Sequence, residues 1–423
     1  MRARYDDQPG RAGLLPAAAP YPMSTTTLPE PSVAALPDRR IARLVGAEPG
    51  PTLIVVGSLH GNEPAGAAGL QRALERLAGG GGVAGPELRG EVVGLAGNLA
   101  ALAQGTRYVE HDLNRLWTAE RLAWVRAADG ERGGPGLTVE EGEMRALDAE
   151  IGRTLDAARA AGRPVFLLDL HTTSGGGPAF CVLEDTLPMR RFGLELEAPL
   201  VLGLEEELSG TLTHWLADLG VVAVGFEAGQ HEDPAAVDRA EAAVWLALEA
   251  AGCLARGARP EVAAARRRLA AERRSLPRVV EVRYRHPVTP GDGFRMAPGY
   301  VTFSRVRAGQ ALAVDHDGPV TTPQDGLLLM PLYQRQGDDG FFLVRQVAPA
   351  WLGLSSRLRR LRLERALHLL PGVRRHPQLA GSFLVDRRVA RFLALDLFHL
   401  LGFRRRGPAT GRWLVMTRRE HDV

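Results

Sequence analysis

The chain has 423 residues, too many for one small hydrophobic core, and this length predicts two or three domains. Hydrophobic residues make up 45% and charged residues 24%, as in ordinary globular proteins, and no apolar run has the length of a membrane-spanning helix. Two cysteines are too few for a disulfide framework or a thiolate metal site, which fits a cytoplasmic location. All 52 basic side chains are arginines, which excludes Schiff-base chemistry at a lysine.

The net charge of +3 hides an uneven distribution. Residues 350–423 hold 16 arginines and 5 acidic residues, whereas the preceding part holds 36 basic and 44 acidic residues. The body is therefore mildly acidic and the C-terminal part strongly basic. At the other end, residues 1–40 are rich in proline and alanine, and we expect a disordered leader there, with Met23 as an alternative start.

Apolar runs of strand type alternate with helical patterns through residues 41–255. This alternation predicts an α/β domain with a mostly parallel or mixed sheet and helices on both faces. The expected strands cover residues 53–56, 92–95, 165–168 and 221–224, and the expected helices cover residues 64–77, 144–155 and 237–248.

Three further segments follow this domain. Residues 256–278 contain an Arg- and Ala-rich helical connector. Residues 279–349 alternate polar and apolar positions between closely spaced Gly- and Pro-containing turns, which predicts a small all-β domain. Residues 350–423 predict an Arg-rich helical extension.

Two histidines and two glutamates stand directly after, or near, the expected strands. They are His60, Glu63, His171 and Glu227. In an open α/β sheet, ligands bind at the carboxyl ends of the strands. Two His and one Glu are a ligand set of catalytic zinc, and a second Glu is the general base that such a site needs. Taken singly, these residues have plainer interpretations: a surface histidine and a helix-start glutamate for His60 and Glu63, a satisfied buried polar group for His171, and a surface loop for Glu227.

A cationic cluster accompanies these residues. Arg107, Asn114 and Arg115 suit a substrate that carries a carboxylate and a scissile carbonyl, although an arginine pair bonded to nearby acids is the plainer alternative. Asp169 is a candidate acceptor for the second nitrogen of a metal-binding imidazole, or alternatively a turn cap.

Four short sequence elements, and their order along the chain, resemble the succinylglutamate desuccinylase/aspartoacylase family, a branch of the zinc carboxypeptidase-like hydrolases. The family's G-x-H-G-N-E element matches residues 58–63, which follow Gly57, and its D-L-N-R element matches residues 112–115, which follow an arginine at the family's spacing. Its D-L-H-T element matches residues 169–172, and its E-x-G element matches residues 227–229. Residues 294–296, 309–310 and 325–330 are similar to the family's C-terminal barrel-sandwich domain. The resemblance covers roughly residues 53–347.

The resemblance implies one Zn²⁺ per chain, bound by His60, Glu63 and His171, with Glu227 as general base. It also implies that Arg107 stabilises the oxyanion, and that Asn114 and Arg115 hold the substrate's carboxylate. The implied reaction is hydrolysis of a small N-acyl amino acid.

Two departures from the resemblance speak against N-acetylaspartate itself. Residues 212–219 lack the arginine that grips the aspartate side chain in aspartoacylase, and Phe341 or Phe342 stands near its substrate-contacting tyrosine.

The C-terminal extension leaves other functions open. A basic amphipathic helix can lie on an anionic membrane or bind nucleic acid. We favour instead a subdomain docked on the acidic body or at a homo-oligomer interface, and we expect no nucleic acid partner. There are two alternatives to an N-acyl amino acid deacylase. One is a zinc carboxypeptidase that acts on peptides, and the other is a non-catalytic protein that binds an anionic partner through the basic tail.

Overall fold

A computed structural model of the chain describes residues 38–79, 85, 87–128, 136–361, 367–379, 381–386, 388–389, 394–405 and 412–418. All of these residues belong to one compact unit. The expected disordered leader at residues 1–40 lies outside the described residues, except for its last three.

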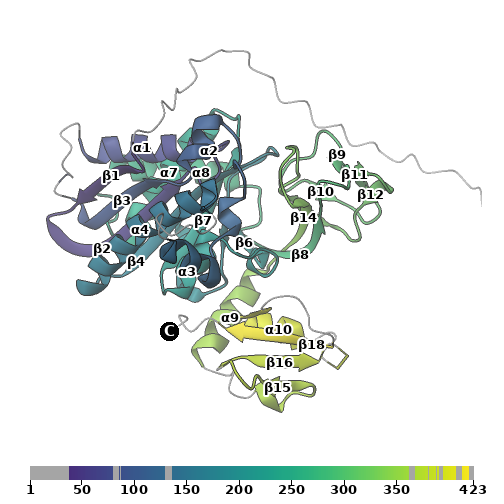
Figure 1. Cartoon of the computed structure of the whole chain (residues 1–423). Coiled ribbons are helices and arrows are strands. Elements are labelled where there is room, and N and C mark those ends of the chain that lie inside the picture. The colour runs from purple at the N-terminus through teal and green to yellow at the C-terminus, as the bar shows by residue number, and fades with distance from the viewer. Residues whose placement is uncertain are drawn as a thin grey trace, which may run out of the picture. The chain divides into compact units, whose positions relative to one another are not determined.

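A mixed sheet dominates the described residues. Its eleven strands run in the order β1-β3-β2-β4-β7-β5-β6-β8-β14-β13-β10 (Figure 1). Strands β3, β2, β4 and β7 are parallel, as are β5, β6 and β8, and the two groups meet at the antiparallel pair of β5 and β7. The strands are β1 Arg40–Val45, β2 Glu48–Gly57, β3 Arg89–Ala96, β4 Val165–Thr173, β5 Phe180–Leu183, β6 Leu200–Leu202, β7 Val222–Gln230, β8 Val279–Pro287, β10 Arg305–Val306, β13 Gly326–Leu329 and β14 Asp339–Gln346.

The four expected strands are confirmed as parts of β2, β3, β4 and β7. The run Leu53–Val56 is fully buried, as expected for a strand covered on both faces of a parallel sheet.

Helices pack on both faces of this sheet, which confirms the expected α/β arrangement (Figure 1). Helix α1 begins at Pro64, whose fixed φ suits a first helical position, and buries Leu70 and Leu74 against the sheet. Helix α4 begins with a capping box between Thr138 and Glu141. The helices of this part are α1 Pro64–Leu77, α2 Leu99–Gln104, η1 Leu113–Arg115, α3 Ala119–Ala127, α4 Val139–Ala160, α5 Leu187–Glu195, η2 Leu204–Glu206, α6 Leu212–Asp218, α7 Ala235–Ala251 and α8 Pro260–Arg273.

Helix α8 confirms that residues 256–278 contain a helix, as expected. After it, β8 pairs in parallel with β6, so that Val279 lies opposite Leu200. The β-rich segment therefore continues the central sheet through β8, β14, β13 and β10. It adds a separate three-stranded sheet of β9 Arg295–Met296, β11 Ala311–Asp315 and β12 Gly318–Thr321.

The C-terminal part corrects the expected helical extension. It contains helices α9 Pro349–Arg360 and α10 Ala394–Leu400, but also a four-stranded antiparallel sheet in the order β15-β16-β18-β17. Side chains in β16 and β18 alternate in burial with a period of two, so Phe383, Val385, Leu414 and Met416 form a small core that a helix could not assemble. These strands are β15 Val373–Arg375, β16 Phe383–Asp386, β17 Phe403–Arg405 and β18 Trp413–Arg418.

A buried ion cluster joins this C-terminal part to the α/β domain. The Asp185 carboxylate, which follows β5, accepts hydrogen bonds from Arg190, from Arg404 and, at 2.9 Å, from Arg359 Nη2. Burial alone would raise the pKa of Asp185, but the three guanidinium groups hold that pKa well below its usual value. The basic segment therefore docks on the acidic body.

None of the helices among the described residues is both long enough and apolar enough to cross a membrane.

Candidate active site and metal centre

The turn between β2 and α1 places His60 and Glu63. Ser58 adopts a left-handed backbone conformation, with φ at 58°, and its hydroxyl donates a hydrogen bond of 3.0 Å to the Glu63 carbonyl. A Cβ on Gly61 would lie 2.0 Å from the carbonyl carbon of Ala101, so only glycine allows the chain to pass here. The turn therefore directs two polar side chains into one buried position.

The first three candidate residues meet at the carboxylate of Glu63. His60 Nδ1 lies 2.8 Å from Glu63 Oε1, and His171 Nδ1 lies 3.1 Å from Glu63 Oε2. The two imidazole rings are 5.2 Å apart between centroids. One ligand atom from each of the three residues can be chosen so that all lie within 4.8 Å of one another. The structure thus brings together the three residues that the sequence predicts as metal ligands.

The second ring nitrogen of each histidine faces a carboxylate. His171 Nε2 lies 3.0 Å from Asp169 Oδ2, as the sequence analysis proposed, and His60 Nε2 lies 3.1 Å from Asp112 Oδ1. Such outer carboxylates fix the orientation and tautomer of metal-binding imidazoles. Sequence reasoning assigned this position to Asp169 but missed Asp112, which it treated only as a partner for arginine.

The charges of this cluster stabilise one another. Burial disfavours ionised Glu63, yet the two histidines outweigh burial and lower the pKa of Glu63 well below its usual value. Burial likewise opposes protonation of His171, but Asp169 and Glu63 raise the pKa of this imidazole well above its usual value. A raised pKa favours the protonated, positively charged form of His171 between the two carboxylates.

Glu227 lies beside this cluster. In the register of β4 and β7 it pairs with His171, and paired residues of neighbouring strands project on the same face of a sheet. Its side chain is buried, and Oε2 has no hydrogen-bond partner among the described residues. Burial, together with the nearby Glu63 and Asp169 carboxylates, raises the pKa of Glu227 to about 8. A buried carboxylate without a partner has the environment of a functional acid or base.

Arg107 completes the charged centre. Its guanidinium donates to Asp112 Oδ2 at 3.2 Å from Nε and 2.9 Å from Nη2, and Nη1 lies 3.6 Å from Glu63 Oε1. Burial disfavours the charged form, but Asp112 and Glu63 raise the pKa of Arg107 above its usual value. The arginine is therefore a permanent cation within the cluster.

Asn114 and Arg115 lie in the short helix η1, just after Asp112. The Asn114 amide oxygen accepts a 2.9 Å hydrogen bond from the backbone N–H of Leu212, so this side chain connects η1 to the start of α6. Its Nδ2 group makes no hydrogen bond with the described residues. Arg115 Nη1 donates to the Asn114 carbonyl at 2.9 Å. Only the nitrogen side of Asn114 therefore remains for a ligand.

The donor set fits a divalent cation of zinc type. The three candidate ligands supply imidazole nitrogens and carboxylate oxygens, which zinc prefers, and all three are buried. Asp169 Oδ1 and Glu227 Oε2 are buried atoms without a hydrogen-bond partner among the described residues. Such unpaired acceptors are costly unless a cation, a water molecule or a substrate satisfies them. The residues therefore fit the implied metal, with Glu227 beside it.

Sequence reasoning missed Glu140, which positions the loop at residues 109–111, between Arg107 and Asp112. Its buried carboxylate accepts hydrogen bonds from the backbone N–H groups of Val109, Glu110 and His111, at 2.7, 3.0 and 3.1 Å. Burial alone would raise the pKa of Glu140, but these backbone donors lower it below its usual value. An acidic residue in the first turn of a helix is common for reasons of dipole alone, so the sequence carried no distinguishing signal.

The two phenylalanines that stand near the expected substrate-contacting position are buried. Phe341 and Phe342 are fully buried in two hydrophobic clusters of the β-rich segment. Neither aromatic ring is therefore available to contact a substrate at a surface.

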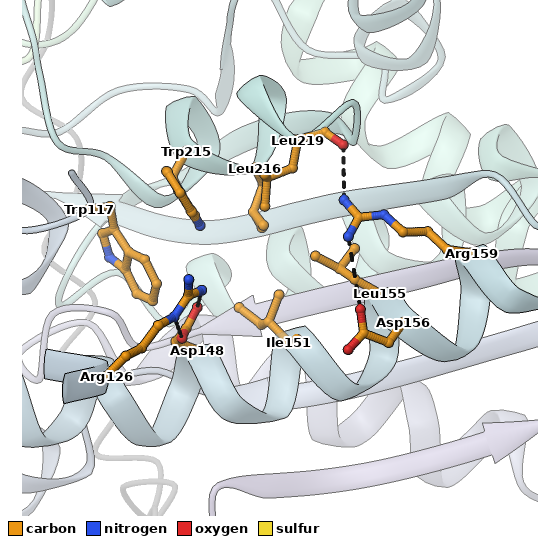
Figure 2. Close-up of a pocket in the computed structure, with 11 residues that line it drawn as sticks. Trp117, Arg126, Asp148, Ile151, Leu155, Asp156, Arg159, Trp215, Leu216 and Leu219 are labelled. Carbon is orange, nitrogen blue, oxygen red and sulfur yellow. Dashed lines mark hydrogen bonds and ion pairs between the residues drawn. The ribbon is translucent and has the colours of Figure 1, made fainter. Parts of the chain in front are cut away.

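A separate cavity of about 390 Å³ lies between α3, α4 and α6. None of the candidate ligand, base or substrate residues lines it. Figure 2 shows that its arginines are paired, Arg126 with Asp148 and Arg159 with Asp156 and the Leu219 carbonyl. The cavity therefore offers apolar walls and paired charges, unlike the candidate metal centre.

A comparison with known proteins finds a family model that matches part of the chain. Residues 49–244 match the family model described as the succinylglutamate desuccinylase/aspartoacylase catalytic domain. No curated protein sequence matches the chain.

Several solved structures are similar to this chain. A succinylglutamate desuccinylase/aspartoacylase from Rhodobacter sphaeroides is 19% identical, with a TM-score of 0.53 over 73% of this chain and 88% of that chain. The ectoine utilization protein EutE (DoeB) from Ruegeria pomeroyi is 21% identical, with a TM-score of 0.49 over 71% and 86% of the two chains. Murine aminoacylase 3 is 18% identical, with a TM-score of 0.45 over 71% and 96%. Residues 49–244 of this chain are therefore similar to the catalytic domain of the succinylglutamate desuccinylase/aspartoacylase family.

Proposed function

We propose that the protein is a zinc-dependent hydrolase that cleaves the amide bond of a small N-acyl amino acid. One observation carries this proposal: His60, Glu63 and His171 converge in a buried position, and an unpaired, buried Glu227 carboxylate lies beside them. The family of residues 49–244 supports the same reaction class.

His60, Glu63 and His171 would hold the ion, one per chain. When bound, zinc supplies Lewis-acid chemistry, which polarises an amide carbonyl and makes a water molecule more acidic. Asp112 and Asp169 orient the two imidazoles through their second nitrogens.

Glu227 is the proposed general base. Its carboxylate takes the proton of the attacking water and later delivers this proton to the departing nitrogen. Its raised pKa in the ion-free protein reflects burial beside two other carboxylates, so a cation at the centre would favour the ionised form that a base requires.

Two arginines have separate proposed roles. Arg107 lies 3.6 Å from Glu63 and carries a permanent charge, which suits stabilisation of the negative oxygen that develops on the amide carbonyl. Arg115, with the free nitrogen of Asn114, suits binding of the substrate's carboxylate.

The alternatives differ in support. A carboxypeptidase would use the same centre, so substrate length distinguishes it from a deacylase. A binder that uses the basic tail needs free arginines, whereas Arg359 and Arg404 are buried on Asp185 and Arg405 pairs with Glu207 at 2.7 Å. These three arginines are therefore engaged with the body of the chain and are not free to bind an external partner.

The test is a hydrolysis screen of the zinc-loaded full chain. The panel contains N-acetyl, N-succinyl and longer N-acyl amino acids, together with short peptides that end in a free carboxylate. We expect turnover of at least one N-acyl amino acid and none after removal of metal. Absence of stoichiometric metal binding, or faster turnover of peptides than of every N-acyl amino acid, would contradict the proposal.

A further inference from the structure

A loop of the β-rich segment lies directly against the loop that follows β4. The backbone N–H of Tyr333 donates to Ser174 Oγ at 3.1 Å, and Ser174 Oγ donates to the Pro331 carbonyl at 3.4 Å. A Cβ on Gly175 would lie 2.7 Å from Pro331 Cγ and 2.8 Å from its carbonyl oxygen. Glycine at this position therefore allows close contact between the two loops.

Gln334 extends this contact by hydrogen bonds to two parts of the α/β domain. Its Oε1 accepts a 3.1 Å hydrogen bond from Asn62 Nδ2 and lies 3.1 Å from His231 Nε2. On its other side, His231 Nδ1 lies 2.7 Å from Thr172 Oγ1. A continuous polar chain thus runs from Asn62 through Gln334 and His231 to Thr172.

The two ends of this chain adjoin the metal-ligand residues. Asn62 immediately precedes Glu63, and Thr172 immediately follows His171. The backbone N–H of Thr172 also donates a 2.9 Å hydrogen bond to Glu63 Oε2. One side chain of the β-rich segment is therefore linked to both segments that carry the candidate ligands, although these segments are far apart in sequence.

The chain of hydrogen bonds has a defined direction. Because Gln334 Oε1 can only accept, His231 must donate from Nε2, and Nδ1 is then free to accept from the Thr172 hydroxyl. This assignment satisfies both nitrogens of a neutral imidazole. Burial, which lowers the pKa of His231, favours the same neutral ring.

We propose that Gln334 and His231 are positioning residues through which the β-rich segment holds the two metal-ligand segments in register. This inference rests on the proposed function, because it assigns the bridge to the same metal centre. Neither residue needs to touch the ion or the substrate. The hydrogen bonds act through Thr172 and Asn62 on the backbones of residues 60–63 and 171–173.

The loop provides a matched set of variants. Gln334→Met removes the acceptor but keeps the length of the side chain, whereas Gln334→Glu keeps an oxygen that accepts from both donors. Gln336→Met makes the same chemical change two residues away, where the side chain forms no hydrogen bond with the described residues. All variants are measured as full chains. A variant enters the comparison only if its unfolding midpoint equals that of the wild-type protein.

Two measurements are made on each variant. Amide hydrogen exchange in the metal-free protein reports on Thr172, whose N–H is bonded to Glu63, and on His231, whose N–H donates to the Thr173 carbonyl at 3.0 Å. Zinc affinity, measured by competition with a chromophoric chelator, reports on the centre itself. For Gln334→Met we expect about tenfold faster exchange at both amides and about tenfold weaker zinc binding, with both restored in Gln334→Glu.

The outcomes separate this inference from the proposed function. Equal exchange and equal zinc affinity in Gln334→Met and Gln336→Met would overturn the bridge, whatever the activity of the protein. A third outcome is that the wild-type protein binds no zinc but amide exchange is still faster in Gln334→Met than in wild type. This result would support the bridge as a structural link and contradict the proposed metal centre. If His231→Leu and Gln334→Met weaken zinc binding additively, the two side chains do not act as one chain, which also counts against the proposal.

Discussion

His171 and Glu227 lie opposite each other on the parallel strands β4 and β7. This register places a candidate metal ligand and the candidate base on the same face of the sheet, although 56 residues separate them in the sequence. The arrangement requires no long or mobile side chain, because two buried strands hold both residues.

Removal of the proposed base should abolish turnover without loss of metal. Glu227→Gln keeps the size of the side chain but cannot accept a proton, so we expect kcat to fall by about 10²–10⁴-fold. Steady-state kinetics on the best substrate of the panel measures this change. Zinc content determined on the same samples is the control, and full activity in the zinc-loaded variant would refute the role of Glu227.

The stability of the metal-free protein should depend on pH through Glu227. Burial beside Glu63 and Asp169 raises the pKa of this carboxyl from 4.5 to about 8 in the folded chain. Between these two values the folded protein holds a proton that the unfolded chain has lost, so this group makes stability fall as the pH rises.

Urea unfolding in the presence of a chelator tests this effect. Glu227→Gln should gain stability relative to wild type between pH 5 and pH 8, because glutamine does not ionise. A difference between the two proteins that stays constant over this range would show that the carboxyl does not titrate as expected.

The outer carboxylates should control metal affinity. Asp112→Asn and Asp169→Asn each replace the negative partner of a histidine Nε2, and we expect zinc to bind about 10–100-fold more weakly. Competition with a chelator provides the measurement. Asp148→Asn is the matched control, because among the described residues Asp148 forms an ion pair only with Arg126 on α3. A similar loss in all three variants would point to a general effect of charge.

The buried ion cluster should stabilise the junction of the C-terminal part. Arg404 contacts Asp185 and the carboxylates of Glu205, Glu206 and Glu281, and its side chain is 11% exposed. Arg404→Met leaves these buried acids short of a cation and should lower the free energy of unfolding by about 3 kcal/mol. Arg405→Met, on the same strand but with 33% exposure, should cost less than about 1 kcal/mol.

The same cluster predicts sensitivity to acid. Because the pKa of Asp185 is held well below its usual value, its contribution is present above pH 3.8 and is lost as the pH falls through the lowered value. Unfolding curves at several acidic pH values should therefore show a steeper loss of stability in wild type than in Asp185→Asn. Parallel curves would contradict a structural role for the carboxylate.

Glu140 should hold the loop that carries Arg107 and Asp112. Glu140→Gln weakens three charge-assisted hydrogen bonds to backbone N–H groups, and we expect a loss of about 1–3 kcal/mol in the free energy of unfolding. Chemical denaturation and amide exchange at residues 109–111 measure the effect. Glu150→Gln, which removes a more exposed partner of Arg40 and Arg153, should change stability by less than about 0.5 kcal/mol.

Local pattern was sufficient to predict much of the α/β domain. The apolar runs that became β2, β3, β4 and β7, and the helical spacing of α1, α4 and α7, are properties of adjacent residues, and they were read correctly from the sequence. Polar residues at the ends of buried strands are expected to meet at one edge of an α/β sheet, and His60, Glu63 and His171 do lie together. Their role as metal ligands stays a prediction.

Other features depended on contacts between distant residues. Asp112 faces His60, Glu140 binds a loop 29–31 residues away, and Gln334 reaches Asn62 across 272 residues, so no local pattern identified these partners. The C-terminal segment was wrongly expected to be all helical, because short apolar runs suit either a helix or a strand until a partner strand satisfies their backbone groups.

The sequence by itself therefore determined the type of domain and the candidate residues of the site, since both follow from residue type and short spacing. Only the tertiary structure decided which carboxylates face the imidazoles, how the basic segment docks on Asp185 and how the β-rich segment reaches the candidate metal centre. These relations arise when the packed sheet brings distant segments together in a buried environment, where each charge needs a partner.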